Sequence, residues 1–167
     1  DPTALRLLGL LLVDRGAPAQ SIALITRSLT LQPDVPTALA DLARAQSASG
    51  DAKSSVESAR RALTLDPALA DAYVQLGRAL TAEQDYAEAE KALRHATTLA
   101  PHSFEAWVSL APVLVQQKDF QAAAEAWEAA LELKPDQPKL LVDYAVTLCE
   151  LSRYGEALSL YQQVLAL

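Results

Sequence analysis

The sequence predicts an all-α protein, a solenoid built from antiparallel helix pairs. Alanine and leucine, both strong helix formers, supply most of the 51% hydrophobic residues. Four prolines then recur at a constant interval, and each follows a helical apolar segment such as Ser-Leu-Thr-Leu-Gln-Pro: Pro33, Pro67, Pro101 and Pro135. Their fixed period, of about 34 residues, is typical of stacked helical repeats. We therefore expect one domain of five repeats at 2–35, 36–69, 70–103, 104–137 and 138–167, the last one truncated.

Each repeat is expected to begin with a helix of about thirteen residues, as the apolar period suggests. Pro36 and Pro138 suit the first helical position, where the missing N–H costs nothing. The predicted first helices lie at 3–15, 37–49, 70–83, 104–117 and 138–151.

A short turn then leads into the second helix of each repeat. In the first two repeats glycine ends the first helix, within Asp-Arg-Gly-Ala (14–17) and Ser-Gly-Asp-Ala (49–52). Asp51, Asp85 and Asp119 can cap the helices that follow. The predicted second helices lie at 19–32, 53–65, 87–99, 121–134 and 155–167.

Small residues recur at three positions of each repeat, where close approach of helices requires them. The first such position holds Gly9, Ala43, Gly77, Ala111 and Ala145, and the others hold alanine or serine except for Val164. Larger residues, including Trp107 and Trp127, alternate with them and are expected in the core. This pattern resembles the tetratricopeptide repeat, with the signature W-x2-L-G-x2-Y, A-x3-F and P. The resemblance covers essentially the whole chain and implies a right-handed superhelix.

The resemblance also implies that the first helices line a concave groove, which takes an extended peptide or a partner helix. Arginines recur at one groove position, as Arg44 and Arg78. The other groove candidates are mainly valines and extend toward the C-terminus: Val74, Val108, Pro112, Val115, Val142 and Val146. We expect a protein or peptide ligand with apolar side chains and at least one acidic group.

Each groove feature also has an alternative interpretation. The arginines can instead form salt bridges with Asp41 or Asp71. The valines can be covered by another part of a longer protein or by a second copy of the chain. Pro112 lies inside a predicted helix and frees the carbonyl of Val108, which either serves a ligand or accompanies a tolerated bend.

Two ligand devices known from the family are excluded, because the chain contains no asparagine. Chaperone-binding members hold a terminal carboxylate with a clamp that includes asparagines. The repeats of O-linked N-acetylglucosamine transferases bind peptide backbone through an asparagine ladder.

Charge and composition argue against several other classes. A net charge of −7 disfavours nucleic acids and anionic membrane surfaces. No apolar run approaches the roughly 18 residues of a membrane span, so no membrane insertion is expected. Cys149, His95 and His102 form no metal-binding or catalytic motif. We therefore expect no enzyme activity, no cofactor and no metal.

The predicted function is a protein–protein interaction scaffold without catalysis. The alternative is a non-catalytic repeat segment of a larger bacterial enzyme, of the glycosyltransferase or sulfotransferase type, or of an exopolysaccharide export or cytochrome maturation protein. The absence of methionine and the apolar ends suggest a piece of a longer chain that self-associates through uncapped ends. The compartment stays open: the cytoplasm is slightly favoured, and a removed signal peptide would indicate the periplasm.

Overall fold

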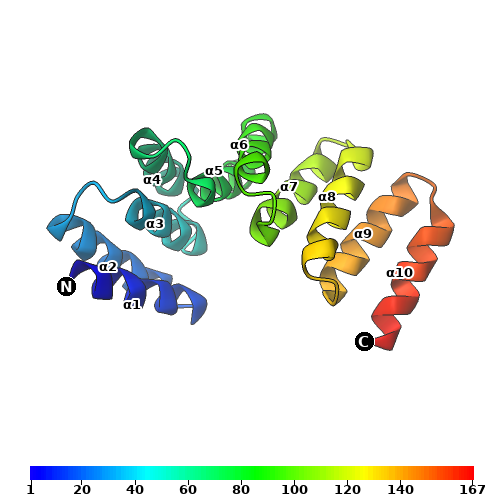
Figure 1. Ribbon diagram of the computed structural model, residues 1–167, viewed down its shortest axis with the longest axis horizontal. Coiled ribbons are helices and arrows are strands. Elements are labelled where there is room, and N and C mark those ends of the chain that lie inside the picture. The colour runs from blue at the N-terminus through cyan, green and yellow to red at the C-terminus, as the bar shows by residue number, and fades with distance from the viewer. The chain divides into compact units, whose positions relative to one another are not determined.

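The computed structural model describes residues 1–167 and contains ten α-helices and no strand (Figure 1). The first helices of the repeats are α1 (Pro2–Asp14), α3 (Pro36–Ala48), α5 (Ala70–Ala82), α7 (Phe104–Gln116) and α9 (Pro138–Glu150). The second helices are α2 (Pro18–Leu31), α4 (Ala52–Leu65), α6 (Tyr86–Leu99), α8 (Phe120–Leu133) and α10 (Tyr154–Ala166). Every predicted helix is confirmed, and each boundary lies within one residue of its predicted place.

The chain forms two compact units, described separately below. Unit 1 is Asp1–Leu99 and contains α1 to α6, and unit 2 is Ala100–Leu167 and contains α7 to α10. In unit 1 each first helix packs against its own second helix, and α3 also packs against the first helices on either side, α1 and α5. In unit 2 the packing runs in sequence, from α7 to α8, α9 and α10. Unit 1 therefore presents a continuous face of three first helices.

The turn inside every repeat has the same backbone geometry. After α1, the N–H of Ala17 donates to the carbonyl of Leu12 at 2.8 Å and that of Gly16 to Val13 at 3.0 Å. This pair of bonds is the Schellman motif, which needs a left-handed residue at its centre. The left-handed residues are Gly16, Gly50, Gln84, Lys118 and Ser152, with φ between 60° and 85°. Glycine adopts this conformation freely, and the last three repeats use other residues for it.

The predicted aspartate caps are confirmed. The carboxylate of Asp51 accepts from the Ser54 N–H at 3.1 Å, and Asp119 accepts from Ala122 at 3.2 Å. Asp85 accepts in the same way from Glu88 at 3.3 Å. Each bond satisfies one backbone donor that the first turn of a helix leaves free.

The small residues are buried where the sequence predicts. Of the fifteen small positions, only Val164 is not buried. Gly77 shows why size matters: a Cβ built there would lie 2.4 Å from Cγ of Leu93, on the second helix of the same repeat. Gly9 has the same relation to Ile25, at 2.6 Å. A missing side chain on one helix therefore admits a branched side chain from the other.

The two tryptophans differ, which corrects one expectation. Trp127 is 3% exposed, and its indole N–H donates to the hydroxyl of Thr147 at 3.1 Å, linking α8 to α9. Trp107 is only half-buried, and its indole N–H donates to the carbonyl of Pro101 at 2.8 Å. The prediction of a core position is confirmed for Trp127 alone.

Candidate functional site

The first-helix face of unit 1, formed by α1, α3 and α5, carries two ion pairs between neighbouring helices. Arg6 on α1 binds the carboxylate of Asp41 on α3 at 2.7 Å. In the other direction, Arg44 on α3 binds Asp14 at the end of α1. Burial raises the pKa of Asp41, while Arg6 and the nearby Arg44 pull that pKa down. These pairs join adjacent repeats and neutralise most of the charge on this face.

Arg44 therefore has a different partner from the two proposed on sequence grounds. Neither Asp41 nor Asp71 binds it, because Asp14 reaches it from the preceding first helix. Asp14 and Arg44 lie in different repeats, so no local motif connects them.

Arg78 on α5 is the one arginine within these three helices that forms no ion pair. It is exposed, as a ligand-binding residue must be. One turn earlier, Gln75 is 9% exposed, and its side-chain oxygen has no hydrogen-bond partner. Together they place a free cation beside an amide with unused hydrogen-bonding capacity.

Val74, by contrast, is not available to a ligand. Its side chain is 1% exposed, because α5 packs against α3 and α6 and covers it. The prediction that Val74 meets an apolar ligand is wrong, and Val74 belongs to the core of unit 1.

The other predicted groove residues belong to unit 2. Val108, Pro112 and Val115 share one face of α7 at spacings of four and three residues, and Val142 and Val146 share a face of α9. Val146 is 49% exposed, Pro112 is exposed, and the other three are half-buried. Pro112 lies inside α7, which continues through it, and it has no N–H to offer the carbonyl of Val108.

The remaining sequence candidates are dispersed. His95 is exposed and its ring lies 4.4 Å from that of Tyr73, while His102 is exposed and Cys149 is half-buried. No three side chains of the metal-binding types come together anywhere in the chain. None of the ten helices has the length and apolarity needed to cross a membrane.

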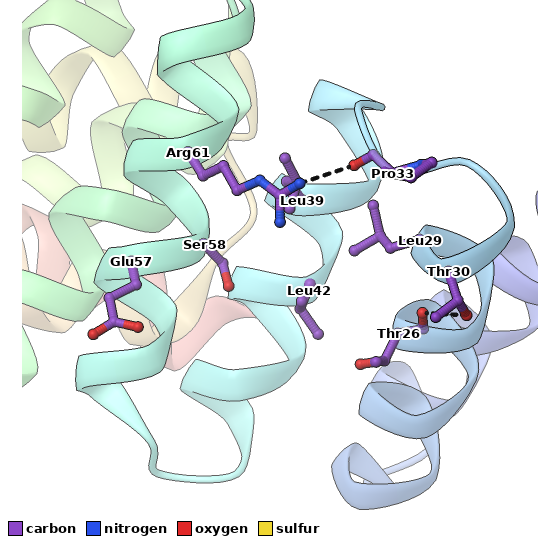
Figure 2. Close-up of a pocket in the computed structure, with 9 residues that line it drawn as sticks. All are labelled: Thr26, Leu29, Thr30, Pro33, Leu39, Leu42, Glu57, Ser58 and Arg61. Carbon is purple, nitrogen blue, oxygen red and sulfur yellow. Dashed lines mark hydrogen bonds between the residues drawn. The ribbon is translucent and has the colours of Figure 1, made fainter.

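A cleft on the opposite side of α3 was not predicted from the sequence. It has a volume of about 380 Å³ and lies between α2 and α4, and Leu39 and Leu42 of α3 line it (Figure 2). The feature of the sequence that relates to this cleft is Leu39, a shorter side chain at the position where the next two repeats carry the aromatic residues Tyr73 and Trp107.

Comparison with solved structures identifies the fold. PilF of Pseudomonas aeruginosa is 28% identical, with a TM-score of 0.87 over 99% of this chain and 75% of its own. A thermophilic TPR protein of Thermus thermophilus is 22% identical, with a TM-score of 0.84 over 99% and 91%. MamA of Desulfovibrio magneticus is 19% identical, with a TM-score of 0.81 over 99% and 93%. All are similar in fold to this chain.

Comparison at the level of sequence is more specific. No curated protein matches the chain. A family model described as a tetratricopeptide repeat matches three overlapping stretches, residues 40–104, 74–138 and 108–167. The matches together run from residue 40 to residue 167, which is well over half of the sequence. The chain therefore belongs to the tetratricopeptide repeat family.

Proposed function

We propose that the chain is a protein-interaction module whose unit 1 binds an acidic peptide segment on its first-helix face. Repeats of this family generally bind protein partners, which supplies the class of ligand but not its chemistry. The observation that carries the proposal is the free guanidinium of Arg78 on a face where Arg6 and Arg44 are neutralised.

The register of the repeats explains why Arg78 is free. Arg44 and Arg78 occupy the same position in successive repeats. The first helix that precedes Arg44 ends at Asp14, and the first helix that precedes Arg78 ends at Ala48, which is the equivalent position. Arg44 therefore has an acid to bind, whereas Arg78 faces an alanine at the corresponding place. A carboxylate supplied by a partner would complete the pair with charge-assisted hydrogen bonds.

The amide of Gln75 supports the same proposal. Its buried oxygen lacks a partner, and a buried polar atom without one is costly. A peptide N–H from a ligand alongside α5 would satisfy it once the Gln75 side chain turns outward. The valine faces of α7 and α9 in unit 2 form a separate proposed surface for apolar side chains of a partner.

The test is a binding titration of a fluorescein-labelled peptide of alternating valine and glutamate, followed by anisotropy. We expect R78A to weaken binding by roughly tenfold or more, since a hydrogen bond to a charged group contributes about 1.5–3 kcal/mol. A48D should weaken it equally, because it gives Arg78 an internal partner.

Arg60 supplies the matched control, since it is exposed on α4, a second helix. R60A should bind as the parent does, and a peptide with lysine in place of glutamate should not bind. Unchanged affinity in both R78A and A48D would refute the proposal.

We also propose that the isolated chain self-associates through α1. Leu7, Leu8 and Leu11 are 49%, 49% and 60% exposed, and exposed apolar patches of this kind usually mark contacts. Light scattering at high micromolar concentration should give a mass above that of one chain, which L8Q/L11Q reduces. A monomeric mass for the parent would contradict this.

The alternative, a non-catalytic repeat segment of a larger bacterial protein, stays a prediction. The full reading frame tests it directly. A catalytic domain encoded next to these repeats would favour it over an independent scaffold.

A further inference from the structure

The cleft between α2 and α4 is built like a binding site for a side chain. Leu29 of α2 and Leu42 of α3 lie on facing sides of it, and Leu39 of α3, 2% exposed, lies deep beside Arg61 (Figure 2). Above them Arg61 of α4 reaches across to the far side. Its guanidinium donates to the carbonyl of Pro33 at 3.4 Å and binds the carboxylate of Asp34 at 3.2 Å. The cleft therefore combines leucine side chains with a planar cation at one edge.

The next repeat shows what occupies the corresponding place. Tyr73 takes the position of Leu39 one repeat later, and His95 takes that of Arg61. The ring centroids of Tyr73 and His95 lie 4.4 Å apart, at an interplanar angle of 51°. In that repeat an aromatic ring from the chain itself thus packs against the planar side chain of the second helix. Leu39 is too short to do the same beneath Arg61.

The wall of the cleft also offers unused polar groups. The hydroxyl groups of Thr26 and Ser58 line it from opposite sides, and neither takes part in a hydrogen bond with the other residues drawn (Figure 2). By contrast, the hydroxyl of Thr30 is bonded to the carbonyls of Thr26 and Arg27. The free hydroxyls can bind a phenolic O–H, which both donates and accepts.

We propose that this cleft receives a tyrosine side chain from a partner protein. The phenol ring would lie on Leu29, Leu39 and Leu42, with its face toward the guanidinium of Arg61. Attraction between a guanidinium and the negative face of an aromatic ring favours that arrangement. The phenolic hydroxyl would reach Ser58 or Thr26. The site lies between α2 and α4 and uses Leu39 and Leu42 of α3, not Asp41 or Arg44, so it is separate from the first-helix face that contains Arg78.

The test follows leucine methyl resonances by NMR during titration with N-acetyl-tyrosinamide. Saturable shifts are expected at the methyl groups of Leu29 and Leu42, with a dissociation constant on the order of 1 mM for so small a ligand. N-acetyl-leucinamide should bind at least tenfold more weakly. N-acetyl-phenylalaninamide should bind severalfold more weakly, and equal binding would overturn the contact with the hydroxyl groups.

Variants that fill the cleft provide the decisive comparison. L39Y supplies the missing ring from within the chain and should abolish binding, as should L39Y/R61H, which rebuilds the Tyr73–His95 pair. S58L fills the cleft from its wall and should also abolish binding. Leucine is accepted at this register, since Leu24 and Leu160 occupy it in the first and last repeats. If substitution of the buried Leu39 prevents folding, S58L therefore still tests whether the tyrosine amide binds in the cleft.

The role of the guanidinium has its own matched pair. R61M keeps much of the side-chain length, removes the cation and should weaken binding severalfold. R60M makes the same change at a neighbouring exposed arginine outside the cleft and should leave binding unchanged. The proposal is overturned if no saturable shift occurs at Leu29 and Leu42, or if S58L binds the tyrosine amide as the parent does.

Discussion

The helix pairs α5–α6 and α7–α8 share one register but fill it with residues of different sizes. The first pair places Gly77 on the first helix and the branched Leu93 on the second. The second pair places Ala111 and Trp127 at the same two positions, and both are buried. The repeat therefore fixes where helices meet, while the sizes of the residues that meet there vary from one repeat to the next.

The exposed sides of the first helices differ in the same way. In unit 1 they carry the ion pairs Arg6–Asp41 and Arg44–Asp14, and in unit 2 the same kinds of position carry valines and Pro112. The fold is thus common to both units, and the chemistry that a partner meets is not. The predictions below test the packing of the common fold first and the charged face of unit 1 last.

The largest effect is expected from W127A in unit 2. The substitution empties a buried volume and removes the hydrogen bond to Thr147, so it should lower the free energy of unfolding by about 3–5 kcal/mol. Urea unfolding followed by circular dichroism measures the loss. W107A is the control, and it should cost clearly less, because Trp107 is half-buried. Equal costs would show that exposure in unit 2 does not govern the contribution of its tryptophans.

A smaller effect is expected from G77A in unit 1. The added Cβ would lie 2.4 Å from the Cγ branch point of Leu93, so the substitution should cost about 1–3 kcal/mol. Hydrogen exchange of α5 and α6 amides measures the change locally. In an L93A background the clash disappears, and the same substitution should cost much less. A cost that is unchanged in that background would rule out the steric explanation.

The smallest effect concerns pH and the charged face of unit 1. Burial raises the pKa of Asp41 in the folded state above its ordinary value of 3.8, in spite of Arg6 and Arg44, and the nearby Asp71 adds to the rise. As the pH rises, Asp41 therefore stays protonated to a higher pH in the folded state than in the unfolded state. This contribution to stability is present below pH 3.8 and is lost as the pH rises through the folded pKa.

D41N cannot ionise and removes this contribution. The difference in free energy of unfolding between the parent and D41N should therefore shift against the parent as the pH rises above 3.8. Urea unfolding of both proteins across that range measures the trend. The reverse trend would mean that the attraction of Arg6 outweighs the burial of Asp41.

The sequence was sufficient for features that depend on local patterns. The prolines, their constant period and the small residues fixed the helix boundaries, and the aspartates fixed the caps. Contacts between repeats were harder to predict. The partner of Arg44 depends on which turn of α1 lies opposite α3, and the burial of Val74 depends on how closely α3 and α5 approach. The cleft beside Leu39 exists because no aromatic ring fills the place that Tyr73 fills in the next repeat. A search of the sequence for motifs finds residues that are present and does not reveal such a gap.

The left-handed turn residue has a consequence for how such chains can be recombined. Gly16, Gly50, Gln84, Lys118 and Ser152 adopt one conformation at one register, although it costs a non-glycine residue about 1–2 kcal/mol. The reversal of the chain is therefore imposed by the paired helices and not by the identity of the turn residue. A segment cut between two successive turn residues has the same backbone geometry at both of its junctions. Exchange, duplication or deletion of a segment one repeat long at these points preserves the frame of the array.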